Sequence, residues 1–201
     1  MKMLSPSFAM RAFALLSALA VSFSAAAQTK AAPTAYPNKP IKIIVPYPPG
    51  GTSDILARLI GQKMGEAWNT QVLIDNKPGA NGNIGADLVA KSPADGYTLL
   101  LADIGSLAIS PSVYSALPFD PAKDFAPVGM VAYSPHILVA HPSVKVNTVK
   151  ELIDVAKSKP GKLNYATSGI GGAPQLAGVE FANRAGISWT YIPYKGGADA
   201  A

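Results

Sequence analysis

The stretch of sequence that decides the fold is Tyr47-Pro48-Pro49-Gly50-Gly51-Thr52-Ser53-Asp54. It follows the apolar run 41–45, which is typical of a buried strand, and it precedes residues 55–68, whose pattern predicts a helix. A strand that turns through two glycines into a helix leaves unpaired backbone N–H groups at the helix start. These groups carry partial positive charge and attract a carboxylate or a phosphate. The stretch therefore predicts an anion site at the end of a strand.

A second loop of the same kind is Ser168-Gly169-Ile170-Gly171-Gly172-Ala173-Pro174. Between the two loops, short apolar segments alternate with amphipathic helical segments, which indicates βαβ units and mainly parallel sheets. In such sheets, ligands lie at the carboxyl ends of the strands. Two loops of this kind, far apart in the sequence, predict an α/β receptor that holds a small anion between two lobes.

The periodicity predicts most of the secondary structure. We expect strands at 41–45, 71–75, 97–102, 163–167 and 187–192, and helices at 55–68, 84–91, 149–158 and 174–186. Thr148 and Glu151 have the spacing of a capping box at the start of the third helix. Residues 127–140 are expected to form a strand that leaves one lobe, a hinge at 133–135, and a strand that enters the next.

Helical spacing also predicts which apolar side chains are buried. On the first helix, the residues expected to share the buried face are Ile55, Leu56, Leu59, Ile60 and Met64. The aromatic residues expected in the core are Trp68, Phe181, Trp189 and Tyr191. Tyr47 is the exception, because it stands beside the first loop and is expected to lie near the ligand.

Residues 1–27 have the pattern of a signal peptide. Lys2 and Arg11 precede an apolar segment, and Ala25-Ala26-Ala27 provides a cleavage site. The apolar segment is shorter than the roughly 20 residues that a membrane-spanning helix needs, so an uncleaved anchor is the less favoured alternative. We expect cleavage after Ala27, a flexible leader at 28–35, and export to the periplasm.

Composition excludes several classes of site. The 201 residues include 17 basic and 12 acidic side chains and no cysteine. Removal of residues 1–27 would leave 15 basic and 12 acidic residues, a net charge of +3. The basic residues are scattered, so no nucleic-acid surface is predicted. Without cysteine we expect no disulfide, no lipid anchor and no thiolate metal site. His136 and His141 would point to opposite faces of a strand, so we expect neither a metal nor a cofactor.

Other readings of the two loops are less favoured. The first loop lacks the Lys-Ser/Thr ending of a phosphate-binding P-loop, and Pro174 breaks the dinucleotide-binding fingerprint in the second. A plain turn with a capped helix remains an alternative, because Asp54 could satisfy the helix N–H groups and compete with an anion. Otherwise Asp54 would orient its neighbours or contact the ligand through water. A secreted hydrolase is a further alternative, but Ser106 and Ser168 lack a nucleophile elbow.

Several strings of this sequence resemble those of the tripartite tricarboxylate transporter receptors, which are Bug-type periplasmic binding proteins. The strings are Tyr36–Gly51, Lys77–Ala86, Asp95–Leu100, Leu117–Pro121, Lys159–Ala166 and Pro193–Gly196. The resemblance covers residues 36–201. It implies a flytrap-like periplasmic binding protein of type II, with two lobes that are each a mainly parallel sheet flanked by helices. Lobe 1 would span 36–133, and lobe 2 would span 134–201 and be incomplete in this chain.

The resemblance also implies a function and a set of site residues. Such receptors are not enzymes; they bind small organic carboxylates and deliver them to a membrane permease. Their ligand loops correspond here to 47–54, 105–106 and 168–175. The expected ligand-binding residues are Tyr47, Gly50, Gly51, Thr52, Ser53, Asp54, Ser106, Ser168, Gly169, Gly171 and Gln175.

Two further expectations follow from the resemblance. Gln175 stands where the family commonly has histidine, and glutamine can form hydrogen bonds but cannot become cationic. We expect a monomeric receptor that feeds a transporter. A receptor that instead reports its ligand to a membrane sensor kinase remains open.

Overall fold

The computed structural model describes residues 35–200, and the chain from Lys39 onward forms one compact unit. The predicted signal peptide at 1–27 and most of the predicted leader lie outside the described residues. Within residues 35–200, no helix is both long enough and apolar enough to cross a membrane.

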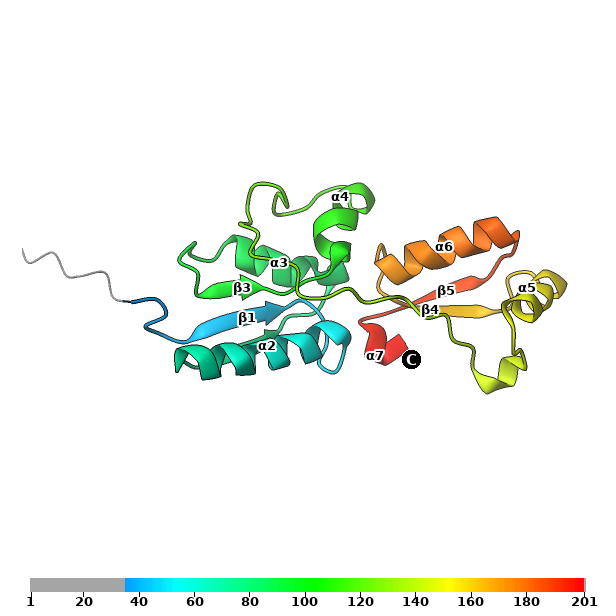
Figure 1. The fold of residues 1–201 in the computed structure, drawn as a ribbon. Helices are drawn as coiled ribbons and strands as arrows, with labels where there is room; N and C mark the ends of the chain where they lie inside the picture. The colour runs from blue at the N-terminus through cyan, green and yellow to red at the C-terminus, as the bar shows by residue number, and fades with distance from the viewer. Residues whose placement is uncertain (1–34, 201) are drawn as a thin grey trace, which may run out of the picture. The chain divides into compact units, whose positions relative to one another are not determined.

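The first sheet consists of three parallel strands (Figure 1). Its elements are β1 (Ile41–Val45), α2 (Thr52–Trp68), β2 (Val72–Asn76), η2 (Ala80–Gly82), α3 (Asn83–Ala90), β3 (Thr98–Leu100), η3 (Gly105–Ile109) and α4 (Ser110–Val113). The strand order is β2-β1-β3, and Val45 pairs with Asn76 while Ile44 pairs with Leu100. The central strand β1 is buried, which explains its nearly continuous apolar sequence. The parallel register places the loops after all three strands at the same edge.

The buried face of α2 differs from the predicted one. Its buried residues are Asp54, Ala57 and Gly61, whereas Ile55 and Leu59 are 52% and 57% exposed. A Cβ atom at Gly61 would lie 3.0 Å from Ile74 Cδ1, so the small side chains let the helix lie close to the sheet. The prediction for Ile55 and Leu59 was wrong because helical spacing alone does not show which side of the helix carries the close contact.

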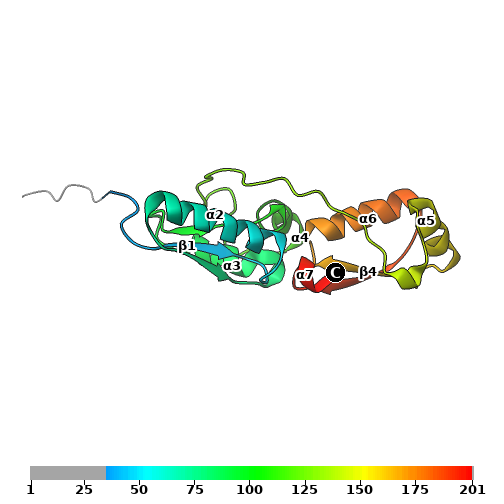
Figure 2. The same ribbon diagram turned by 60° about the horizontal axis from the view of Figure 1, so that its bottom comes forward.

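The second sheet has two parallel strands. Its elements are η4 (Pro142–Val144), α5 (Val149–Ser158), β4 (Asn164–Ser168), α6 (Ala173–Ala185), β5 (Thr190–Tyr194) and α7 (Gly197–Ala200). In both views α6 runs along β4 (Figure 1 and Figure 2). The register pairs Ser168 with Tyr194, so the loops after β4 and β5 also leave from one edge. The α/β architecture with parallel sheets, predicted from the sequence, is confirmed.

An aromatic stack forms the core beside the second sheet. Trp189 is 8% exposed, and its ring stacks on those of Tyr165 and Phe181, with distances of 4.6 Å and 5.6 Å between ring centroids. Tyr191 meets both Tyr165 and Trp189 edge to face. The core prediction was wrong for Trp68, which is 45% exposed because it is the last residue of α2 and lies beyond the part of the helix that covers the sheet.

Residues 127–140 do not form the two strands that were predicted. The segment has no strand and is exposed throughout, with Val128 and Tyr133 about nine-tenths accessible. A strand exists only where its backbone is paired with a neighbour, and among residues 35–200 no sheet partner lies beside this segment. The alternation of apolar residues therefore indicates an extended chain but does not by itself make a strand.

The predicted cap of α5 is confirmed. Thr148 Oγ1 accepts a hydrogen bond of 3.2 Å from the N–H of Glu151. The Glu151 carboxylate accepts a bond of 2.7 Å from the N–H of Asn147, one residue before the cap, rather than from Thr148 itself. The imidazole of His141 accepts a bond from the N–H of Ser143 and so begins the short turn η4.

Candidate functional site

The loops at the carboxyl ends of the two sheets contact each other. Asn81 Nδ2 donates a hydrogen bond of 3.2 Å to the carbonyl oxygen of Gly171. The hydroxyl of Tyr114 donates a bond of 3.2 Å to the carbonyl oxygen of Ile170. Gly196 packs on Pro48 so closely that a Cβ atom at position 196 would lie 2.8 Å from Pro48 Cδ. Loops of the two sheets are therefore in contact at these three points.

At the start of α2, the Asp54 side chain binds groups other than the first N–H groups of the helix. Gly51 is the N-cap and provides no side-chain cap. One Asp54 oxygen accepts a bond of 2.9 Å from the N–H of Gly50, and the carboxylate forms an ion pair with Arg58 at 2.9 Å. Asn76 Nδ2 donates to the other oxygen at 3.0 Å. These partners, with Arg58 foremost, lower the pKa of the buried Asp54 carboxyl to about 2.

The start of α6 has the same construction. Gly172 is the N-cap, again without a side-chain cap. Gln175 Oε1 accepts a bond of 2.6 Å from the N–H of Gly171. Gln175 is three residues after the N-cap, and Gly171 is one residue before it. Gly50 and Gly171 have φ values of +85° and +76°, a conformation that glycine adopts without steric cost. Ser168 ends β4 and leads into this loop.

The backbone N–H groups that are free to bind an anion at the two helix starts are not the predicted ones. The N–H groups of Gly50 and Gly171 are already used by the side chains of Asp54 and Gln175. The first N–H groups of a helix have no acceptor within the helix, which at α2 and α6 leaves those of Thr52, Ser53 and Ala173. Pro174 has no N–H to offer. The groups that can bind an anion therefore lie two or three residues after Gly50 and Gly171.

Tyr47 is partly buried and Ser106 is fully buried. The hydroxyl of Tyr47 donates to the carboxylate of Asp103, which also accepts a bond of 2.7 Å from the N–H of Gly105. Burial and the nearby Asp103 charge raise the pKa of Tyr47 far above its ordinary value, so the phenol stays protonated. Ser106 is fully buried, and its hydroxyl has no hydrogen-bond partner within residues 35–200. Both residues support the loops rather than open onto the cavity.

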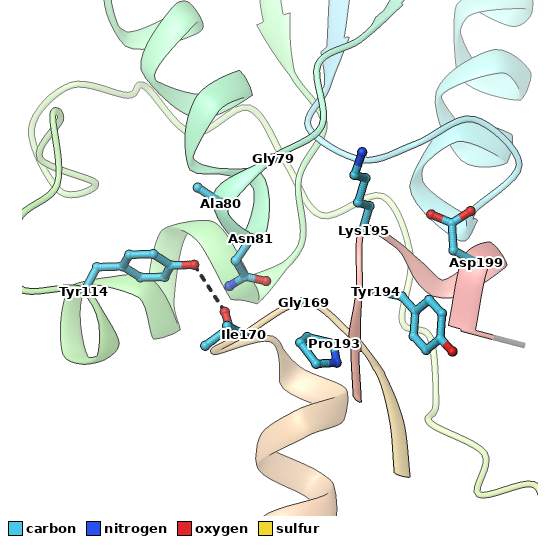
Figure 3. Close-up of a pocket in the computed structure, with 10 residues that line it drawn as sticks. All are labelled: Gly79, Ala80, Asn81, Tyr114, Gly169, Ile170, Pro193, Tyr194, Lys195 and Asp199. Atoms are coloured by element: carbon cyan, nitrogen blue, oxygen red, sulfur yellow. Dashed lines mark hydrogen bonds between the residues drawn. The ribbon is translucent and has the colours of Figure 1, made fainter. Parts of the chain in front are cut away.

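A cavity of about 530 Å³ lies among the loops (Figure 3). Its lining residues are Gly79, Ala80, Asn81, Tyr114, Gly169, Ile170, Pro193, Tyr194, Lys195 and Asp199. Of the predicted ligand residues, Gly169 lines this cavity and the others do not. A volume of this size is within the range of small-molecule sites.

The sequence contained a signal for two of the cavity residues that were missed. Asn81 follows β2 and Lys195 follows β5, so both stand at carboxyl ends of parallel strands, where ligands are expected. Tyr114 follows a short helical piece, and no pattern marks it. Within residues 35–200, no three His, Asp or Glu side chains are grouped so that they could hold a metal ion.

Comparison with known proteins shows the family. The model of the "Tripartite tricarboxylate transporter family receptor" matches residues 56–201. A protein encoded in the tcbD-tcbE intergenic region of Pseudomonas sp. strain P51 is 39% identical over 83% of this chain and 49% of its own length. BugT of Bordetella pertussis is 39% identical over 82% of this chain and 51% of its own length. The chain thus spans about half the length of the curated relatives it matches.

Solved structures agree with this assignment. Rpa4515 of R. palustris, solved with adipate, has a TM-score of 0.81 and 39% identity, covering 82% of this chain and 55% of its own. MatC of Rhodopseudomonas palustris, solved with bound malate, has a TM-score of 0.75 and 27% identity, covering 82% of this chain and 56% of its own. The periplasmic binding protein BugD is a further match at 32% identity. The family consists of receptors that bind solutes and are not enzymes, and this chain belongs to the tripartite tricarboxylate transporter receptor family.

Proposed function

We propose that this chain forms part of a periplasmic receptor that captures a small organic carboxylate and delivers it to the membrane permease of a tripartite transporter. The observation that carries the proposal is the pair of open helix starts at α2 and α6. Each has a glycine cap, and neither has a side chain on its first free N–H groups. Helix starts of this kind attract anions.

The ion pair of Asp54 supports an anion site at α2. A carboxylate in the first turn of a helix would repel a bound acid if its charge were free. Here Arg58 balances that charge, and the carboxylate binds Gly50 and Asn76 rather than the N–H groups of Thr52 and Ser53. The positive end of α2 is therefore still available to a ligand.

The bound molecules of two structural relatives support the ligand class. Rpa4515 was solved with adipate and MatC with malate, and both compounds are small dicarboxylic acids. In our proposal, the N–H and hydroxyl groups of Thr52 and Ser53 bind one side of the ligand carboxylate, and Ala173 binds the other. Gly51 and Gly169 let the backbone approach closely. Tyr47, Asp54, Ser106 and Gln175 hold the loops in place.

The proposal includes the location and the partners of the receptor. Residues 1–27 would direct export and be cleaved after Ala27, and lobes at 36–133 and 134–201 would enclose the ligand as a monomer. Scattered basic residues argue against a nucleic-acid partner. Similar structures described as a periplasmic transporter and as the periplasmic binding protein BugD support the location.

Isothermal titration of the full-length protein tests the proposal. The panel comprises mono-, di- and tricarboxylates, aromatic acids and acidic amino acids, with the corresponding amides as uncharged controls. We expect saturable binding of at least one acid and none of its amide. Failure of every acid to bind a folded protein would contradict the proposal.

A further inference from the structure

Lys195 is a cationic side chain without a partner at the cavity. It follows β5, and Figure 3 shows its side chain fully extended from the loop. Within residues 35–200, no hydrogen bond or ion pair joins its Nζ to another residue. Among the residues that line the cavity it is the one with a positive charge, and Asp199 is the one with a negative charge. The wall of the cavity therefore contains an isolated positive group.

The rest of the cavity combines an apolar wall with a few polar groups. Ala80, Ile170 and Pro193 provide apolar surface. The amide of Asn81 gives one hydrogen to Gly171 and keeps a second hydrogen and its oxygen for another partner. The hydroxyl of Tyr114 donates to Ile170 and can still accept a bond. Such a lining suits a short carbon chain that ends in a polar group.

The cavity adjoins the start of α6, and Lys195 lies beside a contact with the loop that leads into α2. Gly169 and Ile170 line it and lead directly into the start of α6. Gly196, next to Lys195, packs on Pro48 in the loop that leads into α2. An acid held by one carboxylate at the helix starts would therefore extend its other end toward Lys195.

We propose that Lys195 pairs with a second carboxylate of the ligand and so makes the receptor select dicarboxylates over monocarboxylates of the same chain length. The inference rests on the proposed function and assigns a specificity-determining residue to it. Asp199 opposes a second carboxylate, because like charges repel. Lys195 must therefore meet the ligand on the side away from Asp199, and neutralising Asp199 should strengthen the binding of a dicarboxylate.

Matched pairs of acids test the inference on the full-length protein. Succinate is compared with butyrate, and adipate with hexanoate, by isothermal titration. We expect Lys195→Met to weaken the binding of the dicarboxylate by about tenfold, which is the effect of losing one hydrogen bond to a charged group. The affinity for the matching monocarboxylate should change by no more than about twofold. Lys195→Arg should retain most of the preference, and Asp199→Asn should increase it.

Lys162→Met is the matched control, because it removes an exposed lysine from a position that does not line the cavity. It should leave both affinities unchanged, and thermal unfolding should show that every variant is folded. Equal weakening of both acids by Lys195→Met would overturn the inference, and so would an unchanged preference. A wild-type protein that binds no acid would overturn the proposed function and the inference together.

Discussion

The starts of α2 and α6 have the same backbone construction but are stabilised by different side chains. In each, a glycine in the left-handed conformation precedes a glycine N-cap, and the third residue of the helix accepts a hydrogen bond from that first glycine. At α2 this residue is Asp54, and at α6 it is Gln175. Glu151 makes the equivalent bond at α5, to Asn147. The shape of the loop therefore depends on an acceptor at this position and not on one residue type.

The two loops differ in the partners that hold the accepting side chain, Asp54 at α2 and Gln175 at α6. Asp54 is buried and bound to Gly50, Arg58 and Asn76, so several elements fix the first loop. Gln175 is neutral and accepts one bond, from Gly171, and the other bonds to the second loop, from Asn81 and Tyr114, are also neutral. A buried, paired charge holds its position more firmly than one neutral hydrogen bond. We infer that a buried ion pair fixes the loop at α2, whereas neutral hydrogen bonds alone hold the loop at α6.

The largest expected effect is on stability, from Asp54→Ala. The substitution leaves the N–H of Gly50 without its acceptor and removes the ion-pair partner of Arg58, and we expect it to lower the free energy of unfolding by about 2 kcal/mol. Gln175→Ala is the matched comparison and should cost about 0.5–1 kcal/mol. Urea unfolding of the full-length variants measures both. Equal losses would contradict the contrast between the two loops.

The pH dependence of stability should come from the first loop. The folded pKa of Asp54, about 2, lies below its ordinary value of 3.8, so its contribution to stability is complete above that ordinary value. It is lost as the pH falls from about 4 toward 2. Asp54→Asn should remove this part of the acid sensitivity, as measured by the urea midpoint at several pH values. Gln175→Ala should leave the acid sensitivity as it is in the wild-type protein.

The next effect is on binding, from Gly51→Val. Position 51 has a negative φ of −79°, and a Cβ atom there meets nothing closer than the Pro48 carbonyl oxygen at 3.8 Å, so the variant should fold. The branched side chain would cover the start of α2 and weaken carboxylate binding by about tenfold or more. Titration with the acid that binds best measures this. A folded variant with wild-type affinity would remove α2 from the site.

An alanine at the N-cap should lower stability at α6 but not at α2. A Cβ atom at Gly172 would lie 2.9 Å from the carbonyl oxygen of Ser168, so Gly172→Ala should disturb the loop itself. We expect a loss of stability of about 1 kcal/mol, at the low end of the range for overpacked positions. Thermal unfolding of Gly51→Ala and Gly172→Ala compares the two positions directly. Equal stability of the two variants would contradict the difference in packing.

The smallest effect should follow Asn81→Gly. The bond from Asn81 to Gly171 joins the two groups of loops, and glycine accepts the φ of +54° at this position without strain. Loss of one neutral bond offset by relief of strain should change stability by less than about 0.5 kcal/mol. The affinity for the acid should fall about twofold to threefold, as measured by titration. A tenfold loss would instead show that Asn81 contacts the ligand itself.

Local patterns predicted the elements better than they predicted the contacts between them. The apolar run of β1, the cap at Thr148 and the stop at Gly186 all depend on neighbouring residues, and the structure has them as expected. The buried face of α2 depends on how closely Gly61 approaches Ile74, which is a contact between distant residues. The prediction of strands within 127–140 was wrong for the same reason, because a strand needs a paired neighbour that no local pattern reveals.

The candidate site shows the same limit. Glycine spacing located both helix starts, but it could not show that Asp54 and Gln175 already occupy the N–H groups of Gly50 and Gly171. It also gave no sign that Tyr114 lines the cavity, since that depends on where α4 packs. Asn81 and Lys195 could have been predicted as cavity residues, because each follows the end of a parallel strand.

A crystal structure of the full-length protein with its bound acid tests the central claim most directly. We expect the oxygens of one carboxylate to lie about 2.7–3.2 Å from the backbone nitrogens of Thr52 or Ser53 on one side and Ala173 on the other. A bound acid whose carboxylates contact neither helix start, with both starts capped by other side chains, would contradict it.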